Sequence, residues 1–225
     1  VVDGNGNIYF SQPNNHCIRK VTASTKIITI FAGTTIAGFS GDNSNAISAQ
    51  LNYPTGLAFD NNGDLYISDS NNHRIRKINM NNENFTINTF AGTGFSGFNG
   101  DGIVANMSYL YQPNGLAFDS SNNLYIADTF NHRIRKVSSI DRSISTVAGN
   151  GLLGFGGDGT LASISYLNKP VGNCLFSDVA VFSFHPVKIV TSVEGGVAVT
   201  NNLELSSTMQ RLRSHGITRD PTEMQ

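Results

Sequence analysis

The clearest repeated segment of this chain is Ser68-Asp69-Ser70-Asn71-Asn72-His73-Arg74-Ile75-Arg76-Lys77-Ile78. A close copy occupies residues 127–137, and a looser copy occupies residues 11–21. The histidine of the repeated Asn-His pair stands at positions 16, 73 and 132, which are spacings of 57 and 59 residues. A fixed period of this length is typical of a repeat architecture, in which each copy forms one structural unit.

The residues around this segment predict four short strands in each copy. In the second copy the strands are expected at Gly56–Asp60, Asp64–Asp69, Arg74–Ile78 and Thr86–Ala91, which are rich in Ile, Leu, Phe and Tyr. Asn61-Asn62-Gly63 favours a hairpin turn between the first two, because Asn and Gly tolerate positive φ. Four meandering strands per repeat are typical of a β-propeller blade.

The expected fold is therefore mainly β. It is a partial β-propeller of three four-stranded blades over residues 1–167, followed by a small C-terminal strand–strand–helix α/β remnant over residues 168–225. Val1-Val2-Asp3-Gly4 matches only the end of the strand Leu57–Asp60, which suggests a truncated N-terminus. Propellers generally have about four to eight blades, so three blades are expected to leave open edges through which copies could self-associate.

A glycine-rich loop connects each copy to the next. It reads Gly38-Phe39-Ser40-Gly41-Asp42 after the first copy, and related strings stand at residues 97–102 and 154–159. The phenylalanine is expected to anchor the loop on the body of the protein. Together these motifs resemble the NHL-repeat family over about residues 1–167. The resemblance implies a β-propeller fragment that serves as a non-catalytic binding platform, with a protein or glycan ligand on one face.

The composition of the chain limits the classes of binding partner that the sequence predicts. The chain has 15 Lys and Arg against 16 Asp and Glu, so no surplus of positive charge predicts a nucleic-acid ligand. No apolar run approaches the roughly 18 residues that a membrane-spanning helix needs, so no membrane partner is expected. Cys17 and Cys174 stand far apart without a metal-ligand spacing, and two free thiols are expected.

Several other interpretations of the repeats are weaker. Residues 92–97 and 149–154 fit Gly-x-Gly-x-x-Gly, but a dinucleotide site requires a helix to follow, and none is expected. The strand Arg74–Ile78 is expected to have one solvated, charged face.

The repeated histidines and aspartates leave two kinds of metal site open. The histidines could form a metal-binding ring, although we expect them to cap turns. The loop aspartates are expected to form turns, because their loops lack the alternating acidic residues of a calcium loop. The residues concerned are His16, His73, His132, Asp42, Asp101 and Asp158.

The sequence changes character after Lys169. An apolar strand ends at Lys188, and Asn202 favours the start of a helix over about Leu203–His215. Ser-Phe-His-Pro-Val-Lys at 183–188, Glu-Gly-Gly at 194–196 and the string at 213–221 resemble DegT/DnrJ-type aminotransferases that act on nucleotide sugars. The resemblance implies pyridoxal phosphate as cofactor, Lys188 as its Schiff-base lysine and Ser183 as a contact of its phosphate.

The aminotransferase resemblance is incomplete. Val193 stands where the family usually has glycine, and the aspartate that should hold the pyridine nitrogen falls near position 157, which is Gly157. The string 166–172 fits both the propeller repeat and the aminotransferase, so we expect a chimera of two fragments joined there, either by recombination or by a faulty gene model. Without a held cofactor, Lys188 alone is not expected to catalyse transamination.

Three functions follow from these patterns. The first is a non-catalytic interaction scaffold that carries a truncated aminotransferase segment. The alternative is a pyridoxal-phosphate-dependent nucleotide-sugar aminotransferase that uses Lys188 to transfer an amino group to a UDP-linked 4-keto sugar. A third is a propeller enzyme that uses the repeated histidines and a metal.

Overall fold

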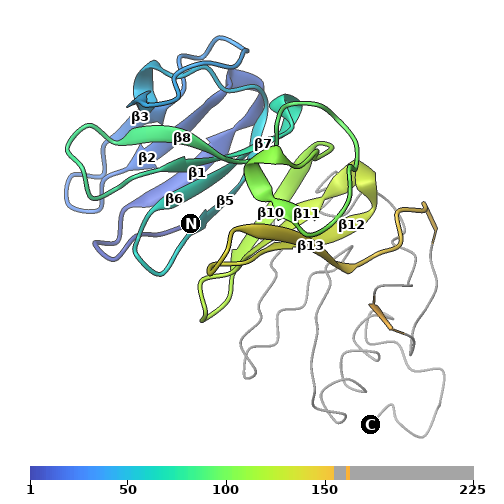
Figure 1. Ribbon diagram of the computed structural model, residues 1–225. Coiled ribbons are helices and arrows are strands. Elements are labelled where there is room, and N and C mark those ends of the chain that lie inside the picture. The colour runs from blue at the N-terminus through green and yellow to red at the C-terminus, as the bar shows by residue number, and fades with distance from the viewer. Residues whose placement is uncertain (155–160, 163–225) are drawn as a thin grey trace, which may run out of the picture.

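The computed structural model describes residues 1–154 and 161–162, and this part of the chain is mainly β (Figure 1). Its strands form three antiparallel sheets that follow one another along the chain. The first sheet contains β1 (Ile8–Gln12), β2 (Cys17–Val21) and β3 (Ile28–Ala32). The second contains β4 (Ser44–Asn45), β5 (Pro54–Phe59), β6 (Leu65–Asp69), β7 (Arg74–Ile78) and β8 (Thr86–Ala91). The third contains β9 (Ile103–Val104), β10 (Pro113–Phe118), β11 (Leu124–Asp128), β12 (Arg133–Val137) and β13 (Ser143–Ala148).

Short 3-10 helices punctuate the strands. They are η1 (Pro13–Asn15), η2 (Ala46–Ser48), η3 (Ser70–Asn72), η4 (Ala105–Met107) and η5 (Thr129–Asn131). Three of them, η1, η3 and η5, join the second and third long strands of a repeat, while η2 and η4 lie in the connecting loops. No helix in the described part of the chain is long and apolar enough to cross a membrane.

The four long strands of the second repeat lie where the sequence predicts them, but the expected four strands per sheet is wrong. The sheets contain three, five and five strands. The fifth strand of the second sheet is β4, which comes from the preceding connecting loop and pairs with the outer strand β8. In the first sheet, Val2 makes only an isolated bridge with Ile8, at the register where Phe59 pairs with Leu65.

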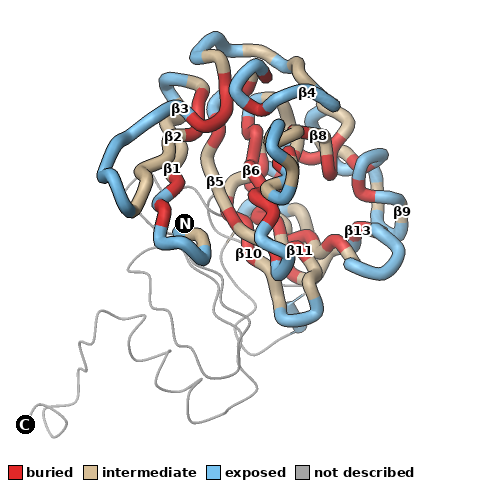
Figure 2. Tube along the Cα trace, turned by 90° about the vertical axis from the view of Figure 1, so that its left-hand side faces the viewer, coloured by how far each residue is buried: buried red, intermediate tan, exposed pale blue. Residues whose placement is uncertain are grey.

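Neighbouring sheets pack through their inner strands. β5 contacts both β1 of the first sheet and β10 of the third. At each junction a tyrosine meets the edge of a phenylalanine from the next sheet: Tyr9 meets Phe59 at 5.5 Å between ring centroids, and Tyr66 meets Phe118 at 4.8 Å. Figure 2 shows the buried segments running along the strands, with exposed segments in the loops. The sheets are therefore held by the apolar faces that their alternating patterns create.

The expected C-terminal strand–strand–helix remnant and Cys174 lie outside the described residues. Cys17, by contrast, is a buried free thiol on β2, as the sequence suggests.

Candidate functional site

The connecting loop before the second sheet contacts the turn η3, and the loop before the third sheet contacts the turn η5. We call the surface formed by these loops and turns the loop face. Asn72, at the end of η3, donates from Nδ2 to the carbonyl oxygen of Gly38 in the preceding loop, at 2.7 Å. Asn131 makes the same bond to the carbonyl oxygen of Gly97, at 2.6 Å. The repeat therefore builds the loop face twice with the same chemistry.

A buried ion-pair network fastens each loop to the sheet that follows it. The guanidinium of Arg76 lies 3.3 Å from Asp69 Oδ2 and 2.7 Å from Asp42 Oδ1, and it also donates to the carbonyl oxygen of Ser40 at 3.1 Å. Arg76 is 0% exposed, so the expected solvated face of this strand is wrong at its central arginine. The strand alternates as predicted, but the charge is covered by the loop.

The third sheet repeats this network. Arg135 lies 3.4 Å from Asp128 Oδ2 and 3.0 Å from Asp101 Oδ1. Burial raises the pKa of Asp128 to about 6, against the opposing effects of its hydrogen bonds from Asn131 and the Tyr111 amide and of the charge of Arg135. Asp42 and Asp101 are thus ion-pair partners of arginine, a role that the sequence pattern does not reveal. Within the described ranges, no group of three or more His, Cys, Asp or Glu side chains could hold a metal ion.

The loop phenylalanines contact arginines rather than the apolar core. The ring of Phe39 lies 3.7 Å from the guanidinium carbon of Arg74, and Phe98 lies 4.0 Å from that of Arg133. Both rings keep part of their surface in solvent, at 41% and 38% exposed. They anchor the loops, as expected, through cation–π contacts.

The repeated histidines end their turns and connect neighbouring sheets. His16, His73 and His132 have φ of 50°, 53° and 50°, the left-handed conformation at the C-terminal cap of each 3-10 helix. The Nδ1 of His73 accepts a hydrogen bond from the amide of Gln112 at 3.2 Å, just before β10, and His16 accepts one from the amide of Tyr53 at 3.1 Å. Burial, and then the neighbouring Arg74, lower the pKa of His73.

The cap position and backbone N–H bond of each histidine confirm the predicted turn-capping role, and the side-chain bonds of His16 and His73 add an inter-sheet contact that the sequence does not predict. The Nδ1 of His132 is buried, and none of the described residues donates a hydrogen bond to it.

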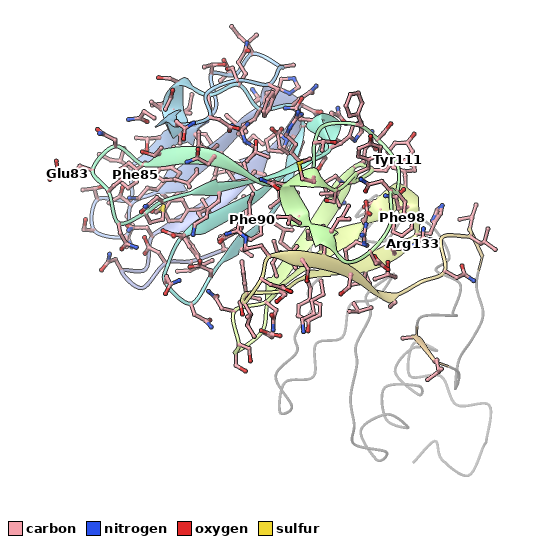
Figure 3. All side chains as sticks on the ribbon, in the orientation of Figure 1. Glu83, Phe85, Phe90, Phe98, Tyr111 and Arg133 are labelled. Carbon is pink, nitrogen blue, oxygen red and sulfur yellow. The ribbon has the colours of Figure 1, made fainter. Side chains whose placement is uncertain are left out.

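Exposed aromatic side chains gather at the junction of the second and third sheets. The ring of Tyr111 lies 5.6 Å from His73 and 5.1 Å from Phe130, which stands on η5. Tyr111 and Phe130 are 38% and 42% exposed. We call Tyr111, Phe130 and His73 the aromatic patch; Figure 3 shows Tyr111 on the same side of the third sheet as Phe98 and Arg133.

The aromatic patch is a local departure from the repeat. At the junction of the first and second sheets, Asn52 and Asn71 stand in place of Tyr111 and Phe130. The backbone geometry is unchanged, because the amide of Asn71 donates to the carbonyl oxygen of Asn52 and that of Phe130 to the carbonyl oxygen of Tyr111, both at 3.1 Å. The scaffold therefore does not require aromatic residues there. An alignment of the repeats could have revealed the patch, because Tyr111 and Phe130 both replace an asparagine of the preceding repeat.

The sequence-predicted residues Lys188 and Ser183 lie outside the described residues, as does Asp158. The structure places the aspartates Asp42 and Asp101 on arginines and the histidines His16 and His73 on amides of the next sheet, while the aminotransferase residues stay predictions.

Comparison with known proteins finds two families in different parts of the chain. NHL repeats are recognised at residues 51–78 and 110–137. Residues 161–225 match the DegT/DnrJ/EryC1/StrS aminotransferase family. The chain thus contains NHL repeats and a fragment of an aminotransferase family member.

Two curated relatives illustrate the two parts. UDP-4-amino-4,6-dideoxy-N-acetyl-beta-L-altrosamine transaminase of Campylobacter jejuni is 52% identical over 54 residues, which are 24% of this chain and 14% of the relative. NHL repeat-containing protein 2 of Bos taurus is 35% identical over 101 residues, which are 44% of this chain and 14% of the relative. The chain therefore spans a small part of the length of each.

Among solved structures, a Bacteroides thetaiotaomicron protein of unknown function superposes with a TM-score of 0.56 at 24% sequence identity, over 75% of this chain and 39% of that one. At this identity the likeness shows a shared fold alone. The fold is thus mainly β, with open sheets arranged like those of propeller proteins.

Proposed function

We propose that this chain, as an array of NHL repeats joined to part of a DegT/DnrJ/EryC1-type aminotransferase, acts as a non-catalytic scaffold that binds a partner protein through the aromatic patch. The observation that carries the proposal is the pair of exposed rings Tyr111 and Phe130, 5.1 Å apart, on a backbone that accepts asparagine at both positions in the neighbouring junction. Exposed aromatic groups that folding does not require are typical of binding sites.

The side chains around the patch favour a protein over a glycan. Tyrosine, phenylalanine and arginine are enriched in protein interfaces, and Arg133 lies in the same part of the loop face. The nearest amides are already engaged with each other, since Gln112 Nε2 donates to Asn71 Oδ1 at 3.2 Å. A glycan would need free polar groups for its hydroxyls, and this pair offers few.

The test is a selection of peptides from a displayed random library on the whole chain, followed by affinity measurement on variants. The double variant Tyr111→Asn/Phe130→Asn copies the other junction, so it is expected to fold and to lose at least about tenfold in affinity, or 1.4 kcal/mol. Tyr53→Gln is the matched control, because Tyr53 is 41% exposed at the other junction and Gln112 stands at its position in the next repeat.

Each outcome separates the alternatives. Peptides that bind the wild type and Tyr53→Gln equally, but not the double variant, support the proposal. A glycan array whose hits depend on the patch, with no such peptides, would replace the partner protein by a glycan. Ligands that bind the double variant as well as the wild type would remove the patch from the binding function.

A second candidate function is the pyridoxal-phosphate-dependent aminotransferase, favoured by the 52% identity to a transaminase over 54 residues. Pyridoxal phosphate supplies the electron sink of such reactions when it is bound. Lys188 and Ser183 would hold it, and they lie outside the described residues, so this candidate rests on the sequence match. A visible absorbance band with added cofactor, absent in Lys188→Ala, would favour it; identical spectra of the two proteins would count against it.

The division at residues 167 and 168, with a chimera joined within 166–172, is part of the proposal. Cloning the transcript across residues 160–175 tests it. One continuous message is the expected result, and two separate messages without a joined one would show that the two parts are different proteins.

A further inference from the structure

A groove opens between the first and second sheets, at the opposite end of β6 from the aromatic patch. It is bordered by the turn at residues 3–7, the turn between β5 and β6, and the turn between β7 and β8. The β5–β6 turn precedes Leu65 whereas η3 follows Asp69, and Figure 3 shows Phe85 of the groove well apart from Tyr111 of the patch. The groove holds about 520 Å³, which is a common size for small-ligand sites.

The groove stays open because two glycines replace the asparagines that bridge the next junction. Between the second and third sheets, the amide of Asn61 donates to Asn122 Oδ1 at 2.9 Å, and Asn61 Nδ2 donates to the carbonyl oxygen of Ser120 at 3.2 Å. Gly4 and Gly63 stand at the positions of Asn61 and Asn122 one repeat earlier. A Cβ added at either glycine would meet no described atom within 4 Å, its chain neighbours aside.

The groove contains a lysine without an acidic partner. Lys20 on β2 and Lys77 on β7 occupy the same register, since each pairs with the tyrosine of the strand before it. The ammonium of Lys77 lies 2.8 Å from Asp64 Oδ2, but Asn7 stands at the position of Asp64 in the first repeat. In the described ranges no carboxylate lies within 4.0 Å of the Lys20 ammonium, which lies 5.4 Å from the centre of the Tyr9 ring.

The two carboxylates that border the groove are already engaged. That of Asp3 accepts four hydrogen bonds of 2.8–3.1 Å, two of them from backbone amides of its own turn. That of Asp60 accepts two backbone amides of its turn at 2.9 Å and lies 3.8 Å from the ammonium of Lys77. Among the described residues that line the groove, Lys20 is therefore the charged group left for a ligand.

Neutral polar groups and apolar surface complete the lining. The side-chain amides of Asn5 and Asn81 are exposed and form no hydrogen bond with the described residues, because both residues bond only through their backbone amides. Each side chain offers donors and an acceptor. Phe59, Met80 and Phe85 supply partly buried apolar surface. Free amides beside apolar surface suit a molecule whose hydroxyl and C–H groups point in different directions, as in a pyranose ring.

We propose that this groove binds an acidic carbohydrate, with a sugar carboxylate on Lys20, hydroxyls on Asn5 and Asn81, and the C–H face of a ring on Phe59 and Phe85. One free cation matches one carboxylate better than the charge of about −2 on a phosphate group. Sugar hydroxyls need free polar groups, and the amides of this groove provide them where the aromatic patch provides few. The groove is thus a second binding site, independent of the partner protein of the patch.

The test is a glycan array, probed with the whole chain, on which acidic oligosaccharides stand beside their neutral counterparts. Calorimetric titration then compares the strongest acidic hit with the same glycan after reduction of its carboxyl group to an alcohol. Lys20→Met removes the charge and keeps an apolar stem, so affinity falls about tenfold or more. Lys136→Met is the matched control, because Lys136 has the same register on β12 and lies 5.9 Å from the ring of Tyr125.

A second variant closes the groove without removing any group that would bind the sugar. Gly4→Asn/Gly63→Asn copies Asn61 and Asn122, and Asn122 already has a positive φ of 62° where Gly63 has 83°. This variant is therefore expected to fold, to bridge the first junction as the second is bridged, and to lose the glycan. Far-UV circular dichroism verifies the fold of each variant.

Acidic glycans that bind the wild type and Lys136→Met, and that Lys20→Met and the double asparagine variant bind at least about tenfold more weakly, support the proposal. An array without acidic hits overturns it. So do hits whose reduced, neutral form binds equally well, or hits that Lys20→Met and the double asparagine variant retain. Hits that instead depend on Tyr111 and Phe130 would move the glycan to the aromatic patch and also overturn it.

Discussion

The arginine at the centre of a strand in the second and third sheets is a buried charge, and burial of a charge has a high desolvation cost. Arg76 and Arg135 are fully buried, and each is held by an aspartate of its own sheet and an aspartate of the preceding loop. The two aspartates differ, because the side chain of Asp128 is 0% exposed while that of Asp101 is 43% exposed. A buried ion pair stabilises little when complete but costs much when one partner is removed.

Removing the arginine of the third sheet should therefore be far more damaging than removing its exposed partner. We expect Arg135→Met to lower the free energy of unfolding by about 3–5 kcal/mol, because Asp128 is left buried without its cation. Asp101→Asn should cost about 0–1 kcal/mol, as for a solvent-exposed pair. Urea unfolding followed by circular dichroism measures both; equal losses would mean that the loop aspartate matters as much as the buried one.

Two glycines with the same backbone conformation should respond differently to substitution. Gly92 has φ of +88° and a Cβ there would overlap the carbonyl oxygen of His73, whereas Gly63 has φ of +83° and open space around it. Gly63→Ala should cost about 1–2 kcal/mol, the penalty of the left-handed conformation. Gly92→Ala adds a steric clash, so we expect a clearly larger loss in the same urea assay. A loss no greater than that of Gly63→Ala would mean that the backbone around Gly92 shifts to relieve the clash at no measurable cost in stability.

Turns between strands act here as connectors between sheets. The 3-10 helix η3 ends on His73, whose ring accepts the amide of Gln112 at the entrance to the next sheet. That bond needs a neutral Nδ1, and burial followed by the charge of Arg74 lowers the pKa of His73. The junction is thus sensitive to protonation.

The sign of the pH effect follows from this shift. The unfolded chain takes up a proton at His73 near the ordinary pKa of about 6.5, while the folded chain resists it. Stability from this group is therefore complete above about pH 6.5 and is lost as the pH falls towards the lowered folded pKa. His73→Asn, which keeps the left-handed turn, should cost about 0.5–1.5 kcal/mol at pH 7.5 and less at pH 5.

Thermal unfolding of the wild type and variant between pH 5 and 7.5 measures this difference, and carboxyl titrations common to both proteins cancel. His132→Asn is the matched variant, because none of the described residues donates a hydrogen bond to His132 Nδ1, so its loss of stability at pH 7.5 should be smaller. If the difference in stability between the wild type and His73→Asn does not change with pH, the hydrogen bond to His73 Nδ1 is not its cause.

The sequence predicts the strands and turns of this fold better than it predicts which distant residues they pair with. The long strands and the turn-capping histidines follow from local signals, namely period-2 alternation and asparagine- and glycine-rich turns. The two-residue strands β4 and β9 are too short to carry such a pattern. The burial of Arg76 depends on Asp42, 34 residues earlier in the chain, which a local reading of the strand cannot include. The patch of Tyr111 and Phe130 becomes visible only when repeats are compared position by position.

As a whole molecule, the described array is coupled from neighbour to neighbour. β5 contacts both β1 and β10, so the second sheet has a sheet on each side. The first and third sheets each have one such neighbour in the described part of the chain. In arrays of this kind, stability is approximately a sum of unit and interface terms, so the unit with fewer interfaces opens at lower free energy.

The reactivity of the Cys17 thiol on β2 can be used to measure local opening of the first sheet. Its side chain is 1% exposed, and burial raises the pKa of its thiol. In a Cys174→Ser variant, which leaves one thiol, we expect labelling by a thiol reagent at dilute, monomeric concentration to be slow and to proceed by opening of the first sheet. The opening free energy from labelling rates should lie below the global free energy of unfolding. Equal values with equal urea dependence would show that the array unfolds as one unit.

Each connecting loop whose short strand, β4 or β9, pairs with the outer strand β8 or β13 belongs structurally to the sheet that comes after it, not to the sheet that it leaves. A stretch from one connecting glycine to the next, such as Gly33 to Ala91, consequently contains a sheet together with its own edge strand and the aspartate for its own buried arginine. Tandem duplication of such a stretch lengthens the array without exposing a new edge. Gene duplication of this stretch would therefore add units whose outer strands are already paired, which limits edge-to-edge aggregation of the lengthened array.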